Sequence, residues 1–233
     1  LELKDKLHLD VSTVTGKTLG QNIQEIQFSW QQNIVKSVAD PIYSEGGMAV
    51  LRGNLAPNTA IIKQSAATDS LLKHSGRAVV FDGLEDLANR IDSEELDVNK
   101  EDILVLRYIG PKGAPGMPEA GLIPIPKKLA RQGVKDMVRI SDGRMSGTAS
   151  GTIILHVCPE AADGGPLALV RTGDRISLDV KSRSLHLHVE DSELTSRRET
   201  LDLTRFIAKR GYHKLYMDHV LQADEGVDFD FLV

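Results

Sequence analysis

Apolar residues in the middle of the chain occur in short runs whose length suits β-strands. Five of these runs are continuous, whereas residues 175–180 and 185–189 alternate between apolar and polar positions. Glycine, proline, asparagine or aspartate separates the runs, as in Asp82-Gly83. The pattern predicts strands near residues 49–51, 60–62, 78–81, 103–106, 137–140, 153–155, 175–180 and 185–189.

Residues 1–44 show a different pattern, with apolar side chains at helical spacing. Thr18 is a suitable N-cap, and Asp40-Pro41 ends the pattern. Shorter helices are predicted at residues 85–91 and 126–132, and helical or irregular structure at residues 193–221. The apolar positions of the predicted N-terminal helix are Leu19, Ile23, Ile26, Trp30, Ile34 and Val38.

These elements predict a mixed, β-rich fold, in which a barrel or sandwich carries flanking α-helices. We expect two parts. Residues 1–44 form a helical linker, and residues 45–233 form the strand-rich body with a helical or irregular tail.

Composition narrows the functional class. The chain has 233 residues, a net charge of -5 and 4% aromatic residues, which together argue against nucleic-acid binding. Its single cysteine excludes a disulfide framework and a zinc or iron–sulfur site built from its own thiolates alone. No apolar run reaches membrane-spanning length and no secretory signal opens the chain, so we expect a soluble, cytoplasmic protein without a membrane partner. Because the first residue is Leu1, we expect a piece of a longer polypeptide.

Two polar loops carry the candidate chemistry. Residues 110–119 contain three glycines and three prolines and end in one carboxylate, Glu119, which suits a hard cation such as Mg²⁺. Residues 141–151 contain three serines, one threonine and three glycines, and Arg144 there is a natural partner for a carboxylate or phosphate. The alternative is that Glu119 is simply solvated and that the second loop is a flexible turn.

The second loop is not the nucleophile elbow of serine hydrolases. That pattern needs glycine two residues before and two residues after the serine, and Ser146 has Arg144 and Thr148 at these positions.

Four sequence blocks lie one after another along most of the chain. They read TVTGKT at residues 13–18, GMAVLRGNLAP at 47–57, GAPGMPE at 113–119 and SDGRMSGT at 141–148. Together they resemble the C-terminal part of the dihydroxy-acid dehydratase/6-phosphogluconate dehydratase family. The segments at 144–149, 156–162 and 222–231 are similar to its sugar-acid branch, the aldonate and pentonate dehydratases. Gly143 is more typical of the dihydroxy-acid branch.

The resemblance implies a hydro-lyase that dehydrates a 2,3-dihydroxy acid, here a sugar acid, to a 2-keto-3-deoxy acid. It implies a swivelling-domain-like β-barrel that closes over the N-terminal catalytic domain of the same polypeptide. That domain supplies the cysteines of an iron–sulfur cluster, either 2Fe–2S or 4Fe–4S, and most of the Mg²⁺ ligands.

The resemblance also implies roles for individual residues. Ser146 matches the family's base at C2, and Thr148 lies beside it near the substrate. Glu119 matches a Mg²⁺ ligand, while Arg144 and Gly147 are expected to bind the substrate. A serine hydroxyl needs a nearby cation to act as a base at neutral pH, which a metal ion provides.

Two alternatives remain at this point. One is a dihydroxy-acid dehydratase of branched-chain amino-acid synthesis, and the other is a non-catalytic barrel for subunit contacts or anion binding. The catalytic interpretation requires Glu119, Ser146 and Thr148 to converge at one open mouth of the barrel. We further expect the chain alone to be inactive, and the apolar stripe with Ile26 and Trp30 to promote a homo-oligomer.

Overall fold

The computed structural model describes residues 2–27, 32 and 34–233 of the chain. The chain divides into two compact units, Leu1–Gly46 and Gly47–Val233. The described part of the chain contains no helix that is both long and apolar enough to cross a membrane.

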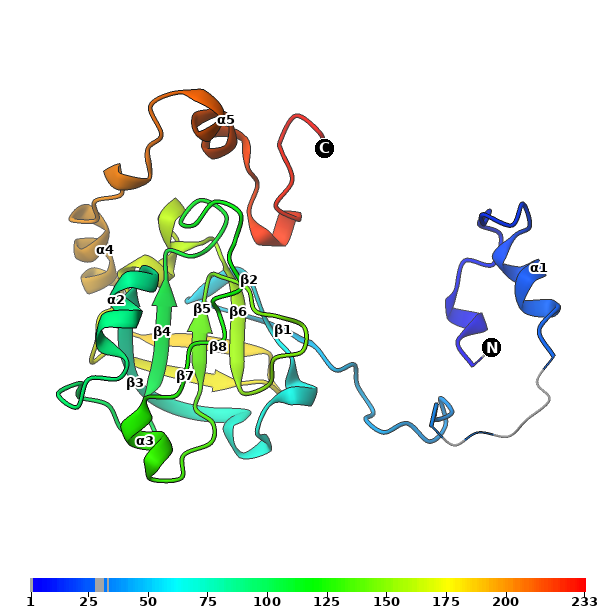
Figure 1. The fold of residues 1–233 in the computed structure, drawn as a ribbon, viewed down its shortest axis with the longest axis horizontal. Coiled ribbons are helices and arrows are strands. Elements are labelled where there is room, and N and C mark those ends of the chain that lie inside the picture. Colours follow the sequence, from blue (N-terminus) through cyan, green and yellow to red (C-terminus); the bar gives the residue numbers. More distant parts are fainter. Residues whose placement is uncertain (1, 28–31, 33) are drawn as a thin grey trace. The chain divides into compact units, whose positions relative to one another are not determined.

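The second unit is built on a closed barrel, to which the described residues contribute eight strands (Figure 1). Their order around the barrel is β1-β2-β6-β5-β4-β3-β7-β8. Every run of residues predicted as a strand overlaps one of them, so the expected β-rich barrel with flanking helices is confirmed. The strands are β1 (Ala49–Gly53), β2 (Ala56–Ile62), β3 (Lys73–Asp82), β4 (Ile103–Arg107), β5 (Arg139–Ser141), β6 (Ile153–Cys158), β7 (Arg175–Asp179) and β8 (Ser184–His188).

Four neighbouring strands of the barrel, β3 to β6, run parallel to one another. Helix α2 (Gly83–Arg90) connects β3 to β4 and lies outside the barrel wall (Figure 1). The carboxyl ends of the four strands therefore meet at one end of the barrel. In folds with parallel strands, ligands bind beyond these carboxyl ends, so this end is the expected place for a site.

The parallel strands are buried on both faces, which explains their continuous apolar sequence. On β3, Ala78 and Val80 belong to the cluster inside the barrel, whereas Val79 and Phe81 belong to a second cluster beneath α2. The β4 residues alternate in the same way between the two clusters. By contrast, β7 and β8 bury only one face, because every second residue of each strand faces away from the core.

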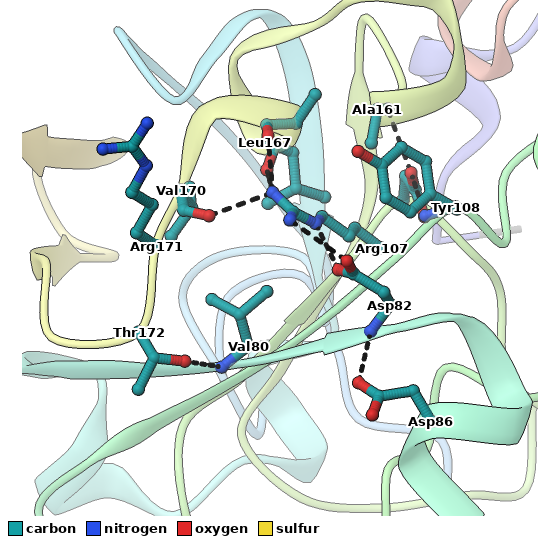
Figure 2. A network of polar contacts seen from close by, with 12 residues as sticks. Val80, Asp82, Asp86, Arg107, Tyr108, Ala161, Leu167, Val170, Arg171 and Thr172 are labelled. Carbon is teal, nitrogen blue, oxygen red and sulfur yellow. Dashed lines mark hydrogen bonds and ion pairs between the residues drawn. The ribbon is translucent and has the colours of Figure 1, made fainter. Parts of the chain in front are cut away.

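Arg107 fixes the carboxyl end of β4 to its surroundings (Figure 2). Its Nε donates to Oδ1 of Asp82 at 2.6 Å, and its Nη1 donates to the carbonyl oxygens of Ala168 and Val170 at 2.5 and 2.9 Å. Only 14% of the side chain is exposed, so the ion pair with Asp82 is partly shielded from water. One guanidinium thus joins β3, β4 and the segment that leads to β7.

The barrel closes where β1 meets β8, and we call this pairing the seam. It consists of one parallel register pair, Arg52 with Ser184. The side chain of Asn54 extends it, because its amide donates to the carbonyl of Leu187 at 2.8 Å and accepts from the Leu187 N–H at 2.7 Å. Gly53 permits this approach, since a Cβ there would lie 1.9 Å from the Leu185 carbonyl oxygen.

Three further helices flank the barrel unit. They are α3 (Lys127–Arg131), α4 (Asp191–Glu199) and α5 (Gly211–His219), and they agree with the predicted helical segments. Gly133 ends the α3 turn with a φ of 87°, as its C-cap role requires. Tyr216 on α5 donates to the carbonyl oxygen of Pro111 at 3.0 Å, so the C-terminal helix contacts the loop that follows β4.

The first unit contains a much shorter helix than predicted. Thr18 caps helix α1 as expected, through a capping box with Gln21, but the helix covers only Leu19–Gln24. The predicted continuation to Val38 is wrong for the described residues, and Trp30 lies outside them. A short amphipathic segment has little helical stability without a packing partner, and the side chains of Ile26, Ile34 and Val38 are exposed.

Candidate active site

Two loops leave the carboxyl end of the parallel strands, one after β4 and one after β5. They are the two loops whose composition suggested chemistry, residues 110–119 and 141–151. The structure brings them into contact, although residues 120–140 separate them in sequence.

Arg144 makes the contact between the two loops. Its Nε donates to the carbonyl oxygen of Met117 at 2.6 Å, and its Nη1 lies 3.5 Å from Oε1 of Glu119. The backbone continues this connection, because the N–H of Gly121 donates to the Arg144 carbonyl at 2.7 Å. The side chains of Arg144 and Glu119 are 45% and 50% exposed, so this long ion pair is open to a ligand.

Ser146 and Thr148 lie side by side at the tip of the second loop. Their hydroxyl oxygens are 3.1 Å apart, and the N–H of Ala149 donates to the Ser146 carbonyl at 3.0 Å. Lys63 reaches the same tip from the end of β2, and its Nζ donates to the carbonyl of Gly147 at 2.8 Å. The candidate base is therefore placed beside a second hydroxyl and near a lysine ammonium group.

The roots of the two loops are built differently from their tips. Asp142 is 1% exposed, and its carboxylate accepts the N–H groups of Tyr108, Ile109 and Ala161, each at 3.0 Å. Burial raises the pKa of this carboxyl above its ordinary value. Sequence reasoning did not single out Asp142, although it opens the loop within the recognisable SDGRMSGT block.

A second buried acid, Glu160, lies at the root of the first loop. It is 1% exposed and accepts the N–H groups of Lys112 and Gly113 at 2.8 and 2.9 Å. Gln222 donates to it at 2.9 Å. Burial again raises the pKa of the carboxyl. Sequence reasoning missed Glu160 too, and its one signal was an acid among the small apolar residues after β6.

His156 on β6 lies beneath the second loop. The backbone N–H of His156 donates to the Gly143 carbonyl at 3.1 Å. The residue has a φ of 51° and lies in a β-bulge, where β6 carries one more residue than the stretch of β2 that pairs with it. Burial and the nearby charge of Arg144 lower the pKa of the imidazole, so it is neutral at pH 7. Its buried Nδ1 has no hydrogen-bond partner among the residues that the structure describes.

The metal-binding capacity of the described residues is limited. The described residues contain no group of three or more His, Cys, Asp or Glu side chains that could hold a metal ion. Glu119 fits a role as one oxygen ligand of Mg²⁺, but the described residues supply no complete set. An iron–sulfur cluster does not fit, because the buried thiol of Cys158 has a pKa that burial raises to about 12.

The sequence matches the family described as dihydroxy-acid/6-phosphogluconate dehydratase C-terminal over residues 33–227. The chain belongs to this family. The match covers both candidate loops and the whole barrel, so the two loops are part of the family's domain and not additions to it.

Several curated relatives are similar over nearly the whole chain. L-arabonate dehydratase from Azospirillum brasilense is 51% identical over 96% of this chain and 39% of its own length. A 6-deoxy-6-sulfo-D-gluconate dehydratase from Pseudomonas putida is 47% identical over 99% of this chain and 40% of its own length. A dihydroxy-acid dehydratase from Ruminiclostridium cellulolyticum is 40% identical over 97% of this chain and 40% of its own length.

These identities place the chain with the sugar-acid branch, since both sugar-acid dehydratases are more similar to it than the dihydroxy-acid dehydratase is. The chain spans about two fifths of the length of the curated relatives it matches.

Proposed function

We propose that the chain is the C-terminal part of a hydro-lyase that dehydrates a sugar acid to a 2-keto-3-deoxy acid. The observation that carries this proposal is the contact between the Glu119 loop and the Ser146 loop through Arg144. Family membership and the names of the sugar-acid relatives support the reaction class.

In this proposal Ser146 is the base that removes the proton from C2. Its half-buried hydroxyl lies beside that of Thr148, which orients it and contacts the substrate. The charge of Lys63, whose Nζ binds the Gly147 carbonyl, favours the ionised form of a nearby hydroxyl. Once the proton is removed, the C3 hydroxyl leaves and the enol tautomerises to the 2-keto acid.

Arg144 and Gly147 are the proposed substrate contacts. Arg144 is half exposed and only loosely paired with Glu119, so its guanidinium is available to the carboxylate of a sugar acid. Gly147 directly follows the proposed base, Ser146. Its N–H stabilises the negative charge that develops on the carboxylate oxygen.

Glu119 is the proposed ligand that this chain contributes to Mg²⁺. Bound Mg²⁺ would supply positive charge for the substrate carboxylate and for the ionised hydroxyl. The remaining ligands and the cysteines of an iron–sulfur cluster then come from an N-terminal domain of the same polypeptide, and we propose that the complete protein is a homo-oligomer.

The proposal is tested by assaying the full-length protein and the 233-residue chain with a panel of aldonic acids and with a branched-chain 2,3-dihydroxy acid. We expect 2-keto-acid formation from an aldonate by the full-length protein and none by the chain. Ser146→Ala strongly reduces turnover, whereas Ser150→Ala, a matched change in the same loop, retains it. If the full-length protein converts only the branched-chain acid, the dihydroxy-acid dehydratase alternative is correct. If it converts none of these acids, the dehydratase proposal fails and the non-catalytic barrel is the remaining alternative.

A further inference from the structure

The two candidate loops share an unusual support, a pair of buried carboxylates at their roots. We propose that Asp142 and Glu160 are positioning residues that fix the Glu119 loop relative to the Ser146 loop. The catalytic meaning of this inference rests on the proposed function, whereas the hydrogen bonds behind it do not.

Asp142 connects the carboxyl ends of three parallel strands. It follows β5 directly and opens the Ser146 loop. Its Oδ2 accepts the N–H of Tyr108, where β4 ends, and the N–H of Ala161, which follows β6, while its Oδ1 accepts the N–H of Ile109. The same carboxylate therefore begins one loop and holds the start of the other.

Glu160 holds the next part of the first loop. Its Oε1 accepts the N–H of Lys112 and the amide of Gln222, and its Oε2 accepts the N–H of Gly113. Gln222 in turn accepts the N–H of Glu160 at 2.8 Å. The loop backbone passes so close that a Cβ at Gly110 would lie 2.7 Å from Oε2. Glu160 thus links this loop to the C-terminal segment.

Burying two carboxylates at the loop roots carries a desolvation penalty in free energy, which indicates that both groups have a role there. No ion pair in the described part of the chain involves Asp142 or Glu160, and the partners of both carboxyl groups there are N–H groups. An ionised carboxylate accepts hydrogen bonds at both oxygens and donates none, which matches a site where only N–H groups point inward.

The backbone of the Glu119 loop is strained at two positions. Tyr108, whose N–H binds Asp142, has a φ of 69°, and Met117, whose carbonyl accepts from Arg144, has a φ of 44°; non-glycine residues rarely adopt such values. Such conformations persist when the surrounding contacts determine them, and they concentrate at functional sites. The strained stretch lies between the Asp142 contact and Glu119, so the position of the Glu119 carboxylate depends on these contacts.

The geometry of Glu160 and Gln222 allows a swap experiment in the full-length protein. In Glu160→Gln, an NH₂ group replaces one of the two carboxylate oxygens. Because this NH₂ group faces N–H donors, which need an acceptor, the contacts with Lys112 and Gly113 weaken. In the double variant Glu160→Gln/Gln222→Glu, the NH₂ group of the new glutamine takes the place of Oε1 and donates to the new glutamate. Its oxygen takes the place of Oε2, which accepts the N–H of Gly113 at 2.9 Å and that of Lys112 at 3.1 Å. The charge is then restored in an exchanged position, and of the contacts with the loop only the 2.8 Å bond from Lys112 to Oε1 is lost.

We expect Glu160→Gln to lower kcat roughly tenfold to a hundredfold with a smaller change in KM, as for other groups that orient a reacting residue. Amide hydrogen exchange in residues 108–116 is expected to speed up, and the double variant to return both readouts to within about threefold of the parent. Gln222→Ala removes one donor to the Glu160 carboxylate and the acceptor of the Glu160 N–H but leaves the contacts with Lys112 and Gly113, so it gives a smaller loss in the same direction.

Three outcomes overturn the inference. They are faster exchange with unchanged kcat in Glu160→Gln, no change of either readout in that variant, and a folded double variant with restored exchange but low kcat. If Glu160→Gln does not fold, the double variant and Gln222→Ala decide the question. If the parent protein dehydrates no sugar acid, the proposed function fails, while the exchange measurements still test the contacts.

Discussion

The roots and the tips of the two loops differ in burial and in contacts. At the roots, Asp142 and Glu160 are each 1% exposed and bind several backbone N–H groups. At the tips, Glu119 and Thr148 are exposed, and the Glu119 carboxylate lies 3.5 Å from the guanidinium of Arg144. The difference agrees with the division of labour that we propose, in which the buried roots set geometry and stability and the exposed tips meet a substrate.

The strongest test of this division is removal of the hydroxyl of Ser146. We expect Ser146→Ala to reduce kcat of the full-length protein about 10³-fold, because a general base supplies roughly 10² to 10⁴ of the rate. The midpoint of thermal unfolding should stay within about 1 °C, since little buried contact is lost. Steady-state kinetics and calorimetry on the same preparation measure both quantities. A Ser146→Ala protein that unfolds much earlier would show that the tip also carries stability.

At the root, the largest effect is expected on stability. Asp142→Ala leaves the N–H groups of Tyr108, Ile109 and Ala161 buried without an acceptor, which costs about 3 kcal/mol in the free energy of unfolding. Denaturant titration of the 233-residue chain measures this loss. Glu199→Ala, at the exposed end of α4, is the matched control and should change stability by less than about 0.5 kcal/mol. Equal losses in the two variants would show that Asp142 contributes no more to stability than an exposed surface residue.

Arg144 connects the two loops near their tips, and its removal should have a smaller effect than the two changes above. Arg144→Met removes a guanidinium that contacts the Met117 carbonyl and the Glu119 carboxylate, and that we assign to the substrate carboxylate. We expect KM for a sugar acid to rise roughly tenfold, in line with the loss of one charge-assisted hydrogen bond. Arg144→Lys should recover part of this loss, because the charge returns without the two-pronged geometry. An unchanged KM in both variants contradicts the substrate role.

The smallest expected effect concerns Cys158, which lies beside the roots. Burial raises the pKa of its thiol to about 12, compared with about 8.5 for an exposed cysteine. The unfolded chain therefore loses a proton that the folded chain keeps, and stability should fall as the pH rises above about 8.5. Denaturant titrations at pH 7.5 and pH 9.5 measure this slope.

Cys158→Ala is the control and should lack this pH-dependent loss of stability. The folded parent should react only slowly with a thiol reagent at pH 8. Rapid labelling of the folded chain would contradict the burial of this thiol beside the loop roots.

Much of the barrel followed from the sequence, because its signals are local. The apolar runs near Ala78 and Ile103 and the alternation in residues 175–180 predict strands whatever their partners are. The same logic overextended α1, since the apolar spacing through Ile34 and Val38 predicts a helix only if another surface covers it. Which strands are neighbours, and that they close into a barrel, depends on contacts between distant residues that spacing does not reveal.

The site shows the same limit. Its tip residues were named from sequence because Ser146, Arg144 and Glu119 carry reactive groups in recognisable blocks. Asp142 and Glu160 were not named, because their importance lies in the backbone N–H groups they accept, and a backbone donor leaves no mark in the sequence. Sequence reasoning thus named candidate residues at the tips of the loops but not the carboxylates that support the loops.

The seam between β1 and β8 has a consequence for the order in which the protein folds. Asn54 and Leu187, whose mutual hydrogen bonds extend the seam, are 133 residues apart in the chain. Bringing such distant segments together carries a high entropic cost, so this pairing belongs to the late steps of folding. During synthesis, β1 and β2 leave the ribosome long before β8 exists. The barrel therefore stays open on the nascent chain until nearly four fifths of these residues have been made, and until then the edge of β1 that pairs with β8 has no partner.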